Sequence, residues 1–117
     1  MTRAFKILTF QACVFATAIL LMSVVADVAR AAPAPAAAVR IDNFTFKNPV
    51  LTVKPGTTVT WTNGDDIPHT VVSKDGLFKS KVLDTGDKFS FTFAKPGQFG
   101  YFCSLHPHMT GTVVVKA

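Results

Sequence analysis

The chain has 117 residues and carries 12 Lys and Arg against 7 acidic residues, a formal net charge of +5. Its basic residues are scattered rather than gathered in a run, so the sequence gives no support for nucleic-acid binding. The length limits the chain to one small domain with a modest hydrophobic core.

The N-terminus predicts an export signal. Arg3 and Lys6 precede an uncharged run over residues 7–26, and Ala31 ends a stretch of small residues that suits a signal peptidase. We predict cleavage after Ala31, so that residues 1–31 are a signal peptide and the mature protein is periplasmic and free of the membrane. An uncharged run of about 20 residues could instead anchor the chain in a bilayer, but threonine and glutamine residues within the run weaken that alternative.

The remaining chain divides into a leader and a folded domain. Residues 32–38 contain only Ala and Pro and predict a flexible leader, and residues 39–117 form the domain. Cys13 leaves with the signal peptide, which makes Cys103 the single cysteine of the mature protein. Small exported domains normally use cysteines in pairs. Cys103 is therefore a free thiol, an intermolecular partner or a metal ligand.

Short strands dominate the predicted domain. Runs rich in Val, Thr and Phe alternate in polarity and are separated by turn pairs such as Pro55-Gly56 and Pro96-Gly97. The pattern predicts an all-β sandwich of seven or eight strands. The predicted runs are Val39 to Phe46, Val50 to Val53, Thr58 to Thr62, Thr70 to Val72, Lys88 to Phe93, Gln98 to Cys103 and Thr110 to Val115.

Two aromatic residues are expected to support the scaffold. Trp61 is the only tryptophan, and we predict that it packs in the core. Tyr101 shares a strand face with Cys103 because side chains alternate along a strand. We expect its hydroxyl to bond to a corner connection, as in other sandwiches.

Metal-ligating side chains are concentrated near the C-terminus. Cys103, His106 and Met109 recur at every third residue after a predicted strand, and His69 follows Pro68 in "IPHTV". If the sandwich brings these segments together, two imidazoles, one thiolate and one thioether surround a common point. That donor set is typical of type 1 copper. Zinc also accepts His, His and Cys, but a thioether is a poor fourth ligand for zinc.

The spacing also distinguishes His106 from its neighbour His108. A loop that turns through a metal at every third residue directs His106 inward, and Pro107 stiffens the chain between the two histidines. We therefore predict that His106 is the ligand and that His108 lies at the surface.

On these residues the domain resembles the cupredoxins, and "CSLHPHM" has the short Cys-x-x-His-x-x-Met loop of the amicyanin-like subgroup. The resemblance extends from "VRIDNFTF" through "VTWTNGDDIPHTV" to "GTVVV". It implies a Greek-key β-sandwich with one copper ion near one end. It also implies that His69, Cys103 and His106 form a trigonal plane and that Met109 is the axial ligand.

The sequence differs from the family pattern at two places. The residue after the first ligand is usually Asn and here is Thr70, so we predict that the Thr70 hydroxyl bonds to that of Ser104 and that the Thr70 amide reaches the Cys103 sulfur. Amicyanins carry Pro where this chain has Leu105 and Phe where it has His108. These replacements predict a more flexible ligand loop.

The resemblance implies a monomeric electron carrier rather than an enzyme. Such a protein cycles between Cu(II) and Cu(I) and meets its partners transiently; a periplasmic dehydrogenase or a c-type cytochrome would suit. Leu105, Pro107, His108 and Pro68 form the predicted partner-facing patch.

Two other functions are possible for these residues. Copper delivery or sequestration is the alternative, but the mature chain has a single Met and places its thiolate at the end of a strand. A cysteine hydrolase built on Cys103 and His69 would lack an evident orienting group.

Overall fold

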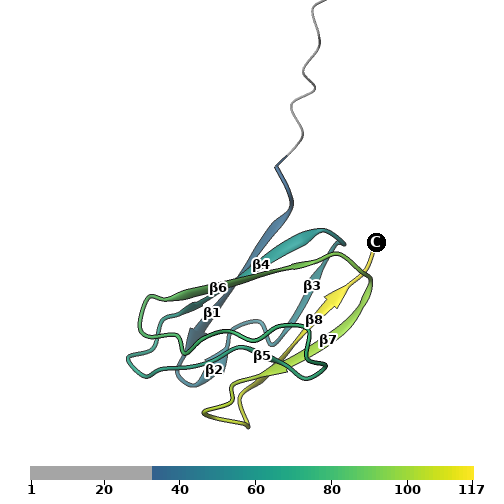
Figure 1. Ribbon diagram of the computed structural model, residues 1–117. Coiled ribbons are helices and arrows are strands. Elements are labelled where there is room, and N and C mark those ends of the chain that lie inside the picture. The colour runs from purple at the N-terminus through teal and green to yellow at the C-terminus, as the bar shows by residue number, and fades with distance from the viewer. Residues whose placement is uncertain (1–32) are drawn as a thin grey trace, which may run out of the picture. The chain divides into compact units, whose positions relative to one another are not determined.

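The computed structural model describes residues 33–117, which form eight β-strands in two sheets (Figure 1). The predicted signal peptide and the first leader residue, Ala32, lie outside the described residues. Within the described part of the chain, no helix has the length and apolar character needed to cross a membrane. The strands are β1 (Ala36–Asp42), β2 (Thr45–Phe46), β3 (Val50–Val53), β4 (Thr57–Asn63), β5 (Val72–Ser73), β6 (Lys88–Phe93), β7 (Gly97–Phe102) and β8 (Thr110–Val115).

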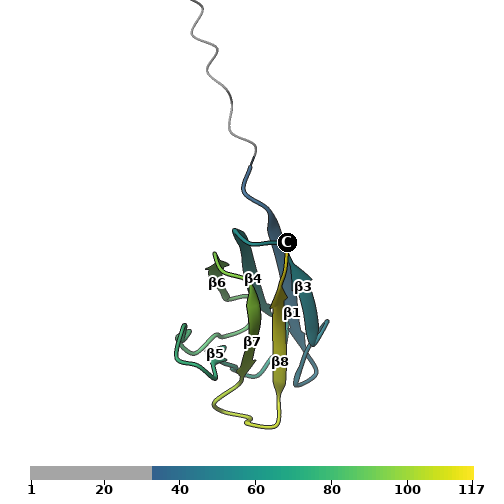
Figure 2. The same ribbon diagram turned by 90° about the vertical axis from the view of Figure 1, so that its right-hand side faces the viewer.

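The two four-stranded sheets pack face to face as a sandwich (Figure 2). One sheet has the order β2-β1-β4-β6 and the other β3-β8-β7-β5. Most neighbours are antiparallel, but β1 pairs with β4 and β3 pairs with β8 in parallel. Parallel neighbours cannot be joined by a tight hairpin, so the chain crosses repeatedly between the sheets. The predicted all-β sandwich is confirmed.

Alternating burial explains how the sheets enclose one core. Strand β4 buries every second residue, including Val59 and Trp61, and leaves the intervening threonines half-buried. Trp61 is fully buried, as predicted, and its ring packs edge-on against Tyr101 at 5.3 Å between centroids. The predicted corner bond of Tyr101 is wrong, because its buried hydroxyl has no hydrogen-bond partner among the described residues. Aromatic packing therefore holds Tyr101 in place.

The folded domain begins earlier than predicted. Ala36, Ala37 and Ala38 were expected in the flexible leader, but they pair with Thr58, Val59 and Thr60 of β4. The Pro35 carbonyl also accepts the Thr58 amide at 3.0 Å. Sheet pairing uses backbone groups, so a stretch of alanines extends a strand although it offers little apolar bulk.

The first predicted run, residues 39–46, is a hairpin rather than one strand. Asn43 and Phe44 form its two-residue loop and have φ angles of 50° and 55°. Asp42 pairs with Thr45 across the loop. The alternation shifts by one residue at Asp42 and Asn43, which are both polar, but no Gly or Pro marks a turn there. The run was therefore predicted as one strand.

Candidate metal centre

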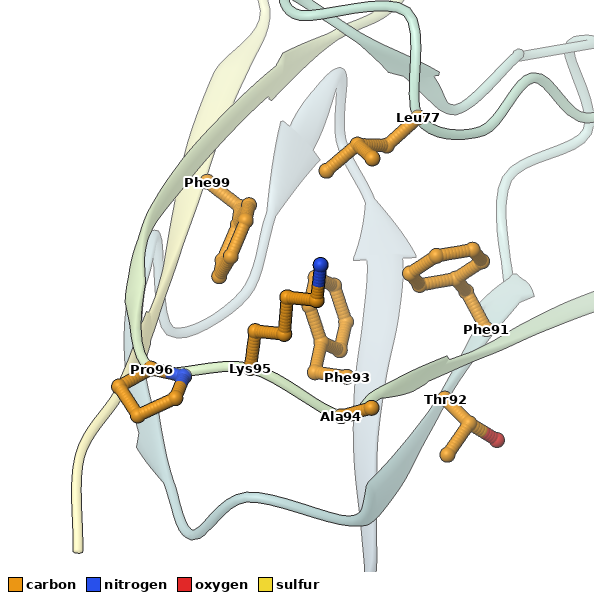
Figure 3. A pocket seen from close by; sticks show the side chains of 8 residues that line it. All are labelled: Leu77, Phe91, Thr92, Phe93, Ala94, Lys95, Pro96 and Phe99. Atoms are coloured by element: carbon orange, nitrogen blue, oxygen red, sulfur yellow. The ribbon is translucent and has the colours of Figure 1, made fainter.

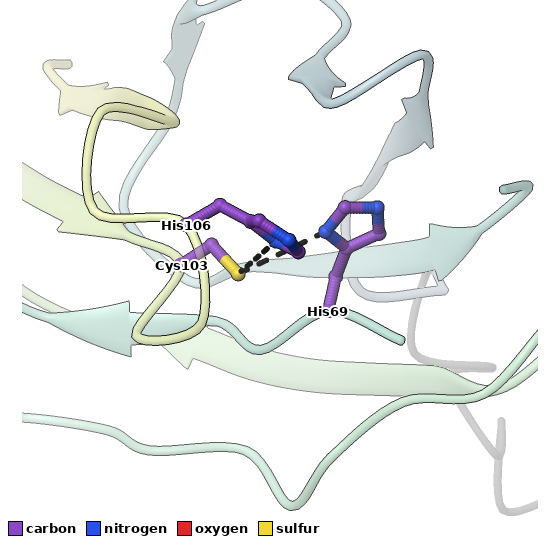
Figure 4. Close-up of side chains that lie close together, drawn as sticks. All are labelled: His69, Cys103 and His106. Atoms are coloured by element: carbon purple, nitrogen blue, oxygen red, sulfur yellow. Dashed lines mark hydrogen bonds between the residues drawn. The ribbon is translucent and has the colours of Figure 1, made fainter. Parts of the chain in front are cut away.

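Two segments distant in sequence bring the site together at one end of the sandwich. His69 lies between β4 and β5, where it pairs through its backbone with Leu83. Cys103 follows β7 directly, and His106 lies in the loop between β7 and β8. The Cys103 sulfur is 3.8 Å from His69 Nδ1 and 3.7 Å from His106 Nδ1 (Figure 4). The predicted meeting of the "PH" corner with the C-terminal loop is confirmed.

The spacing of the donors suits a single metal ion. One ligand atom from each of His69, Cys103 and His106 lies within 4.8 Å of the other two. In a zinc site the metal lies about 2.3 Å from a sulfur ligand and about 2.0 Å from a nitrogen ligand. With tetrahedral to trigonal angles at the metal, these bond lengths place the sulfur and the nitrogen roughly 3.5 to 3.7 Å apart. The observed separations are close to this range, so the three side chains fit a metal without rearrangement of the backbone.

Backbone hydrogen bonds shape the ligand loop. The His106 amide donates to the Cys103 carbonyl at 3.3 Å, and the Met109 amide donates to the His106 carbonyl at 2.8 Å. A third bond, from the Cys103 amide to the Met109 carbonyl at 3.0 Å, joins the two ends of the loop. The loop is therefore two successive tight turns, which accounts for the three-residue spacing of Cys103, His106 and Met109.

Thr70 connects the His69 segment to the ligand loop. Its amide donates to the Cys103 sulfur at 3.3 Å, and its hydroxyl lies 2.8 Å from the Ser104 hydroxyl. The same hydroxyl accepts the Ser104 amide at 2.7 Å. Both predicted contacts of Thr70 are confirmed, and the site residues of the two segments are locked to each other.

The surroundings of Cys103 favour its thiolate. Burial alone would raise the pKa of this thiol, since a charged sulfur is poorly solvated inside the protein. The amide of Thr70, the rings of His69 and His106 and the Thr70 hydroxyl outweigh burial and lower the pKa from 9.0 to about 6. A metal binds the thiolate rather than the thiol, so the site is prepared for metal at neutral pH.

Asp65 orients His69 from the side away from Cys103. Its carboxylate lies 2.7 Å from His69 Nε2 and accepts the amides of Asn43 and Phe44 at 2.6 and 2.9 Å. Burial would raise the pKa of Asp65, but the Phe44 and Asn43 amides and the His69 imidazole lower it below 3.8. A carboxylate bonded to the outer nitrogen directs the other nitrogen toward a metal.

Sequence reasoning missed Asp65. The available signal was a carboxylate four residues before the candidate ligand, but such a spacing has structural meaning only on a helix, and this segment is not helical.

Phe44 is a second residue that the sequence did not indicate. Its ring lies edge-on to both imidazoles, at centroid distances of 5.6 Å from His69 and 5.0 Å from His106. The strand predicted over residues 39–46 included Phe44. The unpredicted turn instead presents its ring to the metal centre.

The remaining predicted site residues lie around the cluster. Met109 is buried, with 6% of its surface exposed, whereas His108 is exposed and outside the three-residue cluster. His106, and not His108, is therefore the histidine of this loop that lies in the cluster. Leu105, Pro107 and Pro68 are exposed, and Leu105 retains 47% of its surface.

A cavity elsewhere in the described residues is unrelated to this chemistry. It has a volume of about 350 Å³ and an apolar wall (Figure 3). Its lining residues are Leu77, Phe91, Thr92, Phe93, Ala94, Lys95, Pro96 and Phe99. None of the cluster residues lines it.

Comparison with known proteins assigns the family. The model of the cupredoxin-like domain matches residues 13–115. The chain belongs to the cupredoxin family. Amicyanin-alpha of Methylorubrum extorquens is 38% identical over 90 residues, covering 73% of this cupredoxin and 76% of the relative.

Solved structures agree with this assignment. A purple cupredoxin from Nitrosopumilus maritimus superposes with a TM-score of 0.64 at 36% identity, covering 68% of this cupredoxin and 99% of that chain. A reduced amicyanin variant gives a TM-score of 0.66 at 36% identity, covering 69% and 82%. This cupredoxin has the family's sandwich, and its His-Cys-His cluster is compatible with copper.

Proposed function

We propose that this cupredoxin is an exported type 1 copper protein that carries single electrons between redox proteins. The observation that carries the proposal is the convergence of His69 Nδ1, His106 Nδ1 and the Cys103 sulfur in a domain of this family. One solved amicyanin, 35% identical to this chain, is a reduced Cu(I) form. That relative supports copper as the metal here.

Four side chains would hold the ion. We propose His69, Cys103 and His106 as its main ligands, with the buried Met109 as the fourth donor. A thiolate, two imidazoles and a thioether suit copper in both of its common oxidation states. When bound, copper supplies a one-electron Cu(II)/Cu(I) couple.

The protein's part in electron transfer is to keep the ligands still. His69 and Cys103 are fully buried, and the Thr70 amide holds the sulfur. Three backbone hydrogen bonds close the loop of residues 103–109 and oppose the flexibility predicted from Leu105 and His108. A site whose ligands move little between two charge states has a small reorganisation cost. This rigidity favours rapid exchange of an electron.

We further propose that electrons leave through His106. It is the one imidazole of the cluster that is partly exposed, and exposed Leu105, Pro107, His108 and Pro68 lie near it in the sequence or the adjoining segment. With the 47% exposed Phe44, they supply apolar surface for a partner. Transient redox complexes bury small interfaces, which this patch suits.

The alternative functions receive less support. Copper delivery requires a site that a partner can reach, but His69 and Cys103 are fully buried. A second catalytic copper centre needs more histidines than the sequence offers, since its three include only His108 outside the cluster. We therefore propose an electron carrier without catalytic turnover of its own.

Export to the periplasm completes the proposal. The charged start, uncharged run and small-residue site of residues 1–31 support cleavage there. N-terminal sequencing of the mature protein recovered from periplasm should begin at Ala32.

Spectroscopy and voltammetry test the copper function. Purified mature protein loaded with one equivalent of Cu(II) should show an intense visible thiolate-to-copper band and a reversible one-electron wave. A coloured protein without a reversible wave would favour copper handling. A colourless protein would exclude a type 1 centre.

A further inference from the structure

The turn that carries Phe44 has a backbone conformation that is unfavourable for its residues. Asn43 and Phe44 occupy the left-handed region at φ 50° and 55°. Two-residue hairpin loops with both φ angles positive prefer Asn-Gly, and Asn43 suits its place. A bulky residue at positive φ is a true outlier, and retained strain of this kind often marks a functional position. The strain at Phe44 therefore points to a function for its side chain.

Asp65 holds this turn and the metal centre with one carboxylate. Oδ1 accepts the Asn43 amide, while Oδ2 accepts the Phe44 amide and lies 2.7 Å from His69 Nε2. Asp65 is itself fixed, because its amide donates to Asn63 Oδ1 at 2.9 Å and its carbonyl accepts the Thr85 hydroxyl at 2.6 Å. The orientation of His69 and the position of the Phe44 backbone are thus set by the same group.

The Phe44 ring covers both imidazoles. It meets His69 and His106 at interplanar angles of 90°, and the two imidazole centroids are 5.0 Å apart. Edge-on contacts between rings are the favoured geometry. His69 is buried and bonded to Asp65, but His106 is partly exposed on a loop. The ring contact therefore matters most for His106.

We propose that Asp65 and Phe44 act together as positioning residues: the carboxylate fixes His69 and the strained turn, and the turn presses the Phe44 ring against His106. The pair keeps both imidazoles directed at the metal and slows escape of the ion. This inference rests on the proposed function, since retention has meaning only if these imidazoles bind copper.

Two glycine variants separate the ring from the backbone strain. Phe44→Gly and Asn43→Gly each place glycine at a positive φ angle, where glycine is favoured, but only the first removes the ring. We expect Phe44→Gly to release copper to excess chelator about tenfold faster than wild type, because loss of a residue that orients metal ligands typically weakens metal affinity by about 10- to 100-fold. Asn43→Gly should release copper at the wild-type rate, and Phe44→Tyr should restore slow release.

A metal-free measurement makes the test independent of copper. Imidazole NMR of the metal-free protein should show a more mobile His106 ring in Phe44→Gly and an unchanged ring in Asn43→Gly. Asp65→Asn should change the tautomer balance of His69 and also loosen His106. If wild type binds no copper, the proposed function fails, and the NMR comparison still decides whether the Phe44 ring positions His106. Equal His106 mobility, or equal copper release, in the two glycine variants would overturn it.

Discussion

The Thr70 amide donates to the Cys103 sulfur at 3.3 Å, across a sequence separation of 33 residues. This bond joins the segment of one histidine to the loop of the other. Because the Thr70 hydroxyl also bonds to both the amide and the hydroxyl of Ser104, Thr70 is the point at which the two halves of the site are fastened together.

Replacing Thr70 with Val should loosen that connection. The change keeps the side-chain shape and the backbone amide but leaves the Ser104 amide without its acceptor, a loss that typically costs about 1 to 2 kcal/mol. Denaturant unfolding of the metal-free protein measures the cost. Ser104→Ala is the matched control and should cost less, because the Ser104 side chain is exposed and its amide keeps the Thr70 acceptor. Equal losses in the two variants would contradict the role given to Thr70.

The two histidines of the loop should respond differently to removal. His106→Ala takes away a donor that lies 3.7 Å from the Cys103 sulfur, so the visible band of the Cu(II) protein should be lost or strongly altered. His108→Ala removes an exposed ring outside the cluster and should leave that band intact. Absorption spectra of both variants at equal copper loading check the prediction. A loss of colour in His108→Ala alone would refute it.

The Cys103 thiol should titrate near pH 6 in the metal-free protein. Its folded pKa of about 6 lies below the ordinary 9.0, so its ionisation contributes stability that is fully present above pH 9 and is lost as the pH falls through 6. Ultraviolet thiolate absorbance under reducing conditions gives the pKa directly. The stability of wild type relative to Cys103→Ser should rise between pH 6 and pH 9. A pH-independent difference would show that the thiol is not perturbed.

Gly111 should not tolerate a side chain. It pairs with Tyr101 on the neighbouring strand, and a Cβ at this position would overlap the buried Tyr101 ring. The ring is confined by Trp61 and Phe46, so it has little freedom to move away. Gly111→Ala should destabilise the protein by about 1 to 3 kcal/mol, as overpacking of a core does. Thermal unfolding measures the loss, and full recovery in the double variant Gly111→Ala with Tyr101→Phe would point to the hydroxyl alone as the clash.

The sequence by itself determined the sandwich and the candidate donors of the metal centre. A strand that packs one face on the core shows alternating polarity, because its side chains point to opposite faces in turn. The bounds of β4 and β6 were therefore predicted closely. The ligands Cys103 and His106 were equally accessible to sequence reasoning. These two residues are only three positions apart in a short loop, so the chain between them keeps their side chains close together.

Only the tertiary structure decided the residues that support those ligands. The contacts of Asp65 and Phe44 depend on backbone amides and on a turn that contains no glycine. Neither feature produces a periodic pattern in the sequence. The Tyr101 hydroxyl, predicted to be bonded, is instead buried and has no hydrogen-bond partner within residues 33–117. Local spacing follows from covalent geometry, whereas contacts between distant segments follow from how the whole sandwich closes around its core.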